Sequence, residues 1–104
     1  MIIYVDFDNT LCITEGVDYA NSKPIKERIN VINELYKKHE IVIYTARGSL
    51  SKINYEELTL GQLNKWGVSF HKLDIGNKPV FDLLIDDRAL SDKHFFDDIN
   101  NINL

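Results

Sequence analysis

The hydrophobic positions of the chain predict strands that alternate with helices. Residues 2–5 form a short apolar, β-branched run that turn-forming residues close at once, and residues 41–44 repeat this pattern. Short continuous apolar runs are typical of strands buried on both faces of a parallel sheet. Residues 81–85 form a third, mostly apolar run, and residues 68–75 hold a weaker one. We therefore expect a mostly parallel sheet of about four to five strands.

The segments between these runs carry helical signals. Apolar residues recur at helical spacing after Pro24, which suits a first helical turn, and Ser22 or Asn21 could cap that helix. Residues 55–66 predict a second helix, and Ser91 could cap a short third one. Strands that alternate with helices in this order predict an α/β protein.

Composition limits the class of protein. The 104 residues are enough for one domain with one core, so we expect a single domain over residues 1–104. Twelve basic and sixteen acidic residues give a net charge of −4, so duplex nucleic acid is not an expected partner. The first residues lack the features of a signal peptide or membrane span, so we expect a cytoplasmic protein with no membrane partner. Cys12, the one cysteine, has no obvious base beside it for nucleophilic chemistry.

Three predicted strands end in residues that can do chemistry. Asp6 and Asp8 follow the first strand, Thr45 the second, and Asp86 and Asp87 the run over residues 81–85. Ligands of such sheets bind outside the carboxyl ends of the strands. Two carboxylates there can divide the work between a nucleophile or metal ligand and an acid or base. Carboxylate oxygens without His or Cys favour Mg²⁺ over zinc. The plainer alternative is that residues 8–10 only form a turn and helix cap.

These residues resemble the motifs of a known family. Residues 6–11, Asp-Phe-Asp-Asn-Thr-Leu, resemble the DxDx(T/V) signature of the haloacid dehalogenase (HAD) superfamily of phosphohydrolases. Residues 43–45 resemble its second motif, Lys78 its third and residues 84–88 its fourth, in family order and over nearly the whole chain. The segments Tyr-Thr-Ala-Arg-Gly (residues 44–48) and Ile-Asp-Asp-Arg-Ala (residues 85–89) most resemble those of small phosphatases of capsule and surface-polysaccharide biosynthesis. They are also similar to those of deoxyribonucleotidases and polynucleotide 3′-phosphatases of the superfamily.

The resemblance implies a fold and a two-step phosphoryl transfer. The fold would be a three-layer, Rossmann-like HAD domain. Asp6 would attack phosphorus to give an aspartyl-phosphate, and Asp8 would protonate the leaving oxygen and then activate the hydrolytic water. Thr45 and Lys78 would hold the phosphate oxygens. Together these four are the expected catalytic residues.

The same resemblance implies a metal site. Mg²⁺ would be held by Asp6, the backbone carbonyl of Asp8 and Asp86, with Asp87 bound directly or through water. The expected substrate-binding residues are Thr45, Ala46, Arg47 and Lys78, with Arg47 placed to bind the rest of an anionic substrate.

The position of Lys78 leaves one alternative open. Lys78 lies eight residues before Asp86, and no helix separates them. A continuous strand over residues 80–86 would span about 20 Å and carry Lys78 to the wrong end of the sheet. A shorter strand over residues 83–86 would avoid this conflict, and Lys72 is the alternative phosphate-binding lysine.

We expect a Mg²⁺-dependent phosphomonoester hydrolase acting on a small phosphorylated substrate, a sugar phosphate of a polysaccharide pathway. The alternatives are a nucleotide or polynucleotide-end phosphatase, and a non-hydrolytic phospho-acceptor or regulatory module. Residues 11–23 have room for a hairpin flap but no cap domain. An uncapped site would accept a large ester, or a second subunit in a homo-oligomer would cover it.

Overall fold

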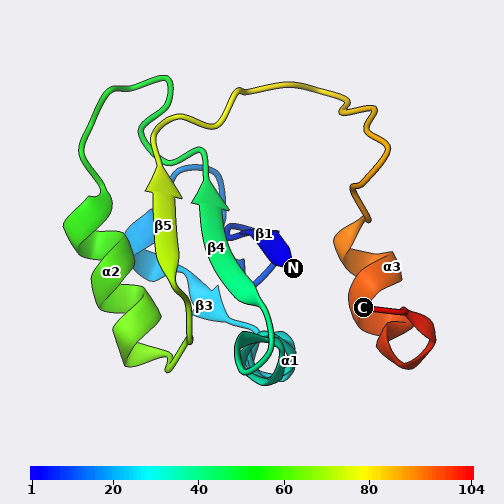
Figure 1. The fold of residues 1–104 in the computed structure, drawn as a ribbon. Coiled ribbons are helices and arrows are strands. Elements are labelled where there is room, and N and C mark those ends of the chain that lie inside the picture. Colours follow the sequence, from blue (N-terminus) through cyan, green and yellow to red (C-terminus); the bar gives the residue numbers. More distant parts are fainter.

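A parallel sheet of three strands forms the centre of the protein, whose computed structural model covers residues 1–104. The sheet order is β1 (Ile2–Asp6), β4 (Glu40–Thr45) and β5 (Lys72–Ile75). Helix α1 (Lys26–Tyr36) connects β1 to β4, and α2 (Glu56–Lys65) connects β4 to β5 (Figure 1). Parallel neighbours require such crossover connections. The predicted α/β class and parallel sheet are therefore confirmed.

Both crossover helices pack against one face of the sheet. Val5 lies opposite Ile43 in the register of β1 and β4, so their side chains share a face. They form one buried cluster with Ile29 and Ile32 of α1 and Leu63 of α2. A fully buried Ile or Leu side chain contributes about 1.5–3 kcal/mol. This core fixes the two strands whose ends carry the candidate chemistry.

The opposite face of the sheet is more open. Ile2 is 64% and Tyr4 55% exposed, and the Tyr4 ring packs edge-on against Tyr44 with centroids 5.4 Å apart. The expected third layer is therefore missing over β1. The parallel sheet is also smaller than the predicted four to five strands.

A small antiparallel flap precedes α1. It pairs β2 (Cys12–Ile13) with β3 (Lys23–Pro24), so the prediction that Pro24 opens the helix was wrong. Ile25 stands at the N-cap without a side-chain hydrogen bond. Neither predicted cap binds the helix: Ser22 shares a 2.6 Å hydrogen bond with Thr14 across the flap, and the Asn21 amide donates to Asp18. A tertiary hydrogen bond has replaced the local cap.

The connecting segment, residues 76–91, crosses from the carboxyl end of β5 to the far side of the sheet (Figure 1). Its apolar side chains are exposed, Ile85 to 90%, and residues 81–85 form no strand. The strand predicted there is therefore absent. A parallel strand starting at residue 81 would follow β5 after only residues 76–80, whereas parallel crossovers usually need a dozen or more residues.

Helix α3 (Asp92–Asp97) follows this segment. As predicted, the Ser91 hydroxyl caps it by accepting a hydrogen bond from the backbone N–H of His94. Arg28 of α1 anchors α3 through a 2.7 Å ion pair with Asp92 and lies 4.8 Å from the centroid of Phe96. None of the helices combines the length and apolar character needed to cross a bilayer. Two single-turn helices complete the chain: η1 (Tyr19–Asn21) and η2 (Ile99–Asn101).

The ion pair between Arg28 and Asp92 makes stability depend on pH. The hydrogen bond from Arg28 lowers the pKa of Asp92 below its ordinary value of 3.8. The ion pair therefore stabilises the folded protein fully above the pKa that Asp92 has in the unfolded chain. This stabilisation is lost as the pH falls through the lower pKa of Asp92 in the folded protein. Asp92→Asn should lower the unfolding free energy at neutral pH by up to about 1 kcal/mol. In urea titrations this deficit should shrink in acid, and a deficit that stays constant down to about pH 2.5 would contradict the assignment.

Candidate active site

Asp6 and Thr45 occupy the carboxyl ends of two adjacent parallel strands. Asp6 is the last residue of β1 and pairs in register with Tyr44, and Thr45 follows Tyr44 as the last residue of β4. Asp8 lies two residues beyond β1, and the Thr45 hydroxyl is 3.5 Å from its Oδ2. The structure thus brings the three residues together at the edge of the sheet where ligands of α/β proteins bind.

Asp6 binds an ammonium group from a distant part of the sequence. Lys78 Nζ donates to Asp6 Oδ1 at 2.7 Å, and the Thr10 hydroxyl donates to Oδ2 at 3.0 Å. The Asp6 side chain is 42% exposed, and that of Lys78 only 17%. Lys78 Nζ also lies 5.2 Å from the centroid of Tyr44, a distance suited to a cation–π contact. A half-exposed carboxylate is thereby paired with a largely buried cation.

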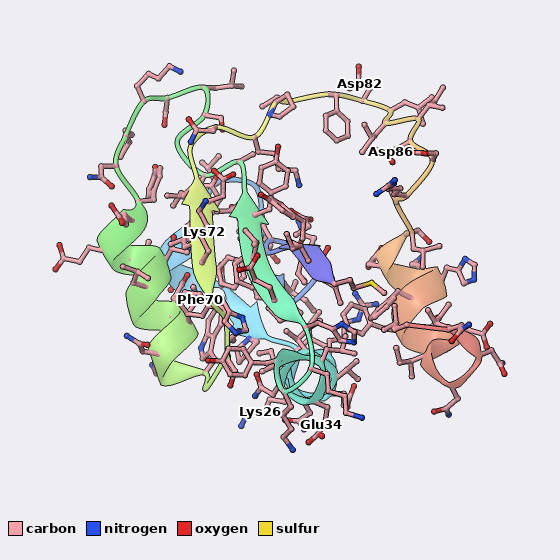
Figure 2. All side chains as sticks on the ribbon, in the orientation of Figure 1. Lys26, Glu34, Phe70, Lys72, Asp82 and Asp86 are labelled. Carbon is pink, nitrogen blue, oxygen red and sulfur yellow. The ribbon has the colours of Figure 1, made fainter.

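The structure separates Lys78 from its alternative, Lys72. Lys72 is the first residue of β5, pairs in register with Val42 and is exposed. Thr45 pairs with Ile75, three residues further along β5, so Lys72 lies about 10 Å before the carboxyl edge. Figure 2 shows Lys72 on β5 below the connecting segment. Lys78 is therefore the lysine at the candidate site.

Asn9 gives the turn after β1 its shape. It has a positive φ of 62°, the left-handed conformation that Asn tolerates better than most residues. Its side-chain oxygen accepts a hydrogen bond from the backbone N–H of Thr14 at 3.0 Å. This turn ends the strand and places Asp8 two residues beyond Asp6.

Asp8 is held by hydrogen bonds from several elements. Its Oδ1 accepts from the Thr14 hydroxyl at 2.6 Å, and Arg47 donates to both carboxylate oxygens, at 2.8 and 3.0 Å. The side chain of Arg47 is completely buried. The expectation that Arg47 binds substrate directly is therefore corrected, because its buried guanidinium is already paired with the Asp8 carboxylate. Ala46, beside it, is half-buried.

Sequence reasoning missed the residues that surround Arg47. Thr59 and Gln62 of α2 are both buried and accept hydrogen bonds from the guanidinium at 3.0 and 2.6 Å. A signal was present, because these two polar residues stand three apart on the face of α2 that also carries buried Leu63. Polar residues on an apolar helix face indicate a buried polar partner.

The four predicted metal ligands do not converge in this structure. Asp86 and Asp87 lie on the connecting segment and are exposed, and Figure 2 shows Asp86 far from the sheet. One Asp86 oxygen accepts a 2.6 Å hydrogen bond from the backbone N–H of Arg88. No group of three or more His, Cys, Asp or Glu side chains is arranged to hold a metal. The donor chemistry suits Mg²⁺, but the positions do not fit a magnesium site in this arrangement.

Cys12 lies against this site as a buried thiol. Its sulfur is 3.7 Å from Asp8 Oδ1 and 3.6 Å from the Thr14 hydroxyl. Burial is the main cause that raises the pKa of the Cys12 thiol, and the negative charge of Asp8 adds to the effect. Because the thiolate is the nucleophilic form, this environment argues against a nucleophilic Cys12.

The fold and the site define an α/β protein with a parallel sheet whose carboxyl edge carries an acidic and basic cluster. The crystal structure of an MCSG target from Vibrio cholerae has the same fold, with a TM-score of 0.77. The two sequences are 30% identical, and the match covers 99% of this chain and 89% of that chain. This chain and the Vibrio cholerae protein therefore belong to one family. No protein-family profile and no curated protein matches the chain.

Proposed function

We propose that this protein is a phosphomonoester hydrolase of the HAD superfamily that works through an aspartyl-phosphate on Asp6. The supporting observation is that Asp6, Asp8, Thr45 and Lys78 lie together at one edge of the sheet. Lys78 is separated from Asp6 by 72 positions in the sequence, yet its ammonium contacts the Asp6 carboxylate. A nucleophilic carboxylate, a second carboxylate, a hydroxyl and an ammonium are the groups that phosphoryl transfer needs.

The first step of the proposed reaction transfers the phosphoryl group to the protein. An Asp6 carboxylate oxygen attacks phosphorus, and the bond between phosphorus and the leaving-group oxygen breaks. Asp8 gives its proton to that oxygen, which leaves as an alcohol. Lys78 and Thr45 contact the phosphoryl oxygens and stabilise their negative charge.

The second step releases phosphate. Water attacks the phosphorus of the aspartyl-phosphate and loses a proton to Asp8, which is now ionised. The bond between phosphorus and the Asp6 oxygen breaks, so inorganic phosphate and free Asp6 result. Asp8 is protonated again and ready for the next cycle.

Magnesium is a separate part of the proposal. We expect it to be held by Asp6, the backbone carbonyl of Asp8 and Asp86, with Asp87 bound directly or through water, because carboxylate and carbonyl oxygens are the donors that Mg²⁺ prefers. These residues do not form a metal site in this arrangement, so the two steps above use only the protein's own groups. Binding of Mg²⁺ would require the connecting segment to approach β1.

The finer fold belongs to the same proposal. We propose the three-layer HAD architecture without a cap, in which the connecting segment, although it forms no strand here, packs beside β1. Support comes from the edge of β1 that has no strand partner and from the exposed side chains of Leu83, Leu84 and Ile85. Burial of these three exposed apolar side chains against the sheet would be favourable, because it removes apolar surface from water.

The substrate we propose is a small phosphate ester, a sugar phosphate in the cytoplasm. The half-exposed Asp6 is consistent with direct access from solvent. The flap between β2 and β3 is much too small to be a cap domain. Selectivity would then come from this flap, from the loop after β4 or from a second copy of the chain.

A phosphate-release assay tests this proposal. Its substrates are a hexose phosphate, a nucleoside monophosphate and a 3′-phosphorylated oligonucleotide, each with Mg²⁺ and with a chelator. We expect release from the hexose phosphate, faster than from the other two, and only with Mg²⁺. Faster release from a nucleotide or oligonucleotide would favour that substrate class. No release from any ester with Mg²⁺ present would refute the hydrolase, and equal rates with chelator would refute only the metal.

A further inference from the structure

Arg47 occupies a site that is built for a guanidinium group. Its side chain has no exposed surface, and its Cζ lies 4.7 Å from the ring centroids of both Phe7 and Tyr19. Aromatic rings attract a cation placed at this distance. A buried charge is nevertheless costly unless it is paired and hydrogen-bonded, so the partners of Arg47 indicate what the charge is for.

All five N–H donors of the guanidinium have partners. Nε and one Nη2 hydrogen form the two bonds to Asp8, and Nη1 donates to Thr59 and Gln62. The remaining Nη2 donor faces the Ser22 hydroxyl at 3.4 Å. Because a guanidinium has five donors and no acceptor, none is left for a substrate.

The partners of Arg47 are themselves fixed in place. The Gln62 amide donates to the backbone carbonyl of Tyr19 at 2.6 Å, so it presents its oxygen to Nη1. Tyr19 lies in η1, and Gln62 lies in α2, so two elements hold the guanidinium from outside the sheet. The plane of Arg47 therefore fixes the plane of the Asp8 carboxylate, because a two-bond pair of this kind is coplanar.

The same contacts select one oxygen of Asp8. A carboxylate has about four acceptor positions. Arg47 fills two of them and the Thr14 hydroxyl fills a third, on Oδ1. The fourth position is on Oδ2, and the Thr45 hydroxyl faces this oxygen at the longer distance of 3.5 Å. Oδ2 is therefore the oxygen that can exchange a proton on the side where Thr45 would hold a phosphate.

We propose that Arg47 is a positioning residue, which fixes Asp8 so that Oδ2 exchanges the proton in both steps of the reaction. This inference rests on the proposed function, and it replaces the direct substrate contact expected for Arg47 from the sequence. A proton donor must be held closely in position to act, and a planar guanidinium does this better than an ammonium.

The choice of leaving group separates positioning from other roles. p-Nitrophenolate leaves without a proton, whereas the alkoxide of glycerol phosphate needs one. In Arg47→Lys, kcat/KM for glycerol phosphate should fall roughly 10²-fold, with kcat carrying the loss, because general acid catalysis contributes about 10²–10⁴-fold. For p-nitrophenyl phosphate the loss should stay below about tenfold. The matched control is Arg28→Lys, which changes the other Arg that pairs with an Asp and a ring; both substrates should retain their rates.

A double-mutant cycle shows whether Arg47 acts through Asp8. In an Asp8→Asn background, Arg47→Lys should cause no further loss for glycerol phosphate. Thr59→Val removes one partner of Nη1 and keeps Arg47, so it should give a smaller loss with the same dependence on leaving group. It also keeps the test valid if Arg47→Lys unfolds below the assay temperature, which thermal unfolding will show.

Three results would overturn the inference. Equal losses of kcat/KM for both esters in Arg47→Lys and Thr59→Val would indicate a purely structural role. A raised KM with unchanged kcat would indicate direct substrate binding, and additive losses with Asp8→Asn would show that Arg47 acts elsewhere. Wild-type protein that releases phosphate from neither ester would refute the proposed function itself, and the role of Arg47 with it.

Discussion

Replacing Asp6 by asparagine should abolish phosphate release, with kcat reduced by roughly 10⁴-fold or more, as for the loss of other catalytic nucleophiles. An amide oxygen cannot form the acyl-phosphate bond that a carboxylate forms. The substitution is nearly isosteric: the amide oxygen can still accept the hydrogen bond from Lys78, and the amide N–H can donate to the Thr10 hydroxyl, which can also act as an acceptor. The loss should therefore be chemical, with thermal unfolding close to that of the wild type.

The matched control for Asp6→Asn is Asp74→Asn. Asp74 lies on β5 beside Tyr44 and accepts a 3.3 Å hydrogen bond from Asn77, so it is a carboxylate of the same sheet outside the cluster. This variant should keep wild-type turnover. Wild-type turnover by Asp6→Asn would contradict the assignment of the nucleophile.

The same experiment separates a hydrolase from a phospho-acceptor. Wild-type protein mixed with an aryl phosphate and quenched in acid should carry a transient covalent phosphate, visible by intact mass, which Asp6→Asn lacks. A phosphorylated wild type that persists without turnover would favour the acceptor module over the hydrolase. The two functions differ in the second step, in which Asp8 activates water.

The sheet and the site around Asp6 were predictable because their signals are local. The apolar runs of β1 and β4 end in residues that cannot continue a buried strand, so the sequence indicates both the strands and their carboxyl ends. Adjacent parallel strands then bring Asp6 close to Thr45. Lys78 was predicted beside Asp6 by resemblance, while spacing alone left Lys72 open.

The environment of Arg47 could not be predicted because it depends on distant partners. Asp8 is 39 positions away, and the helix residues that complete the site are 12 and 15 positions away. An Arg after a strand is ordinarily exposed, and burial becomes favourable only when all donors are satisfied. The local sequence pattern around Arg47 does not show whether these donors will find partners.

The strand prediction for the connecting segment was wrong because the local signal was present but its partners were not. Residues 81–85 have the composition of a strand, but a strand also needs a neighbour and a connection long enough to reach it. In this structure Lys78 is tied to Asp6 and Asp92 to Arg28, so both sides of the segment are anchored. The chain between these anchors crosses outside the sheet, and Asp86 lies away from the sheet (Figure 2).

Lys78→Met should lower kcat/KM for a phosphate ester by roughly 10²–10³-fold, the cost of removing one preorganised charge from a transition state. Methionine keeps most of the side-chain length and loses the ammonium. The Lys78 side chain is largely buried against Tyr44, so an apolar replacement fills the same space. The loss should be electrostatic, and the unfolding temperature should change little.

Lys72→Met supplies the control and decides between the two lysines. Lys72 is exposed at the start of β5, three residues before the strand end that lies beside Thr45. Its removal should leave kcat/KM within about twofold, because an exposed charge about 10 Å away is largely screened. A large loss in Lys72→Met, with none in Lys78→Met, would mean that the active protein holds the phosphate from the other lysine. The 2.7 Å contact between Lys78 and Asp6 leads us to expect the reverse, because the ammonium already neutralises the carboxylate that must approach an anionic phosphate.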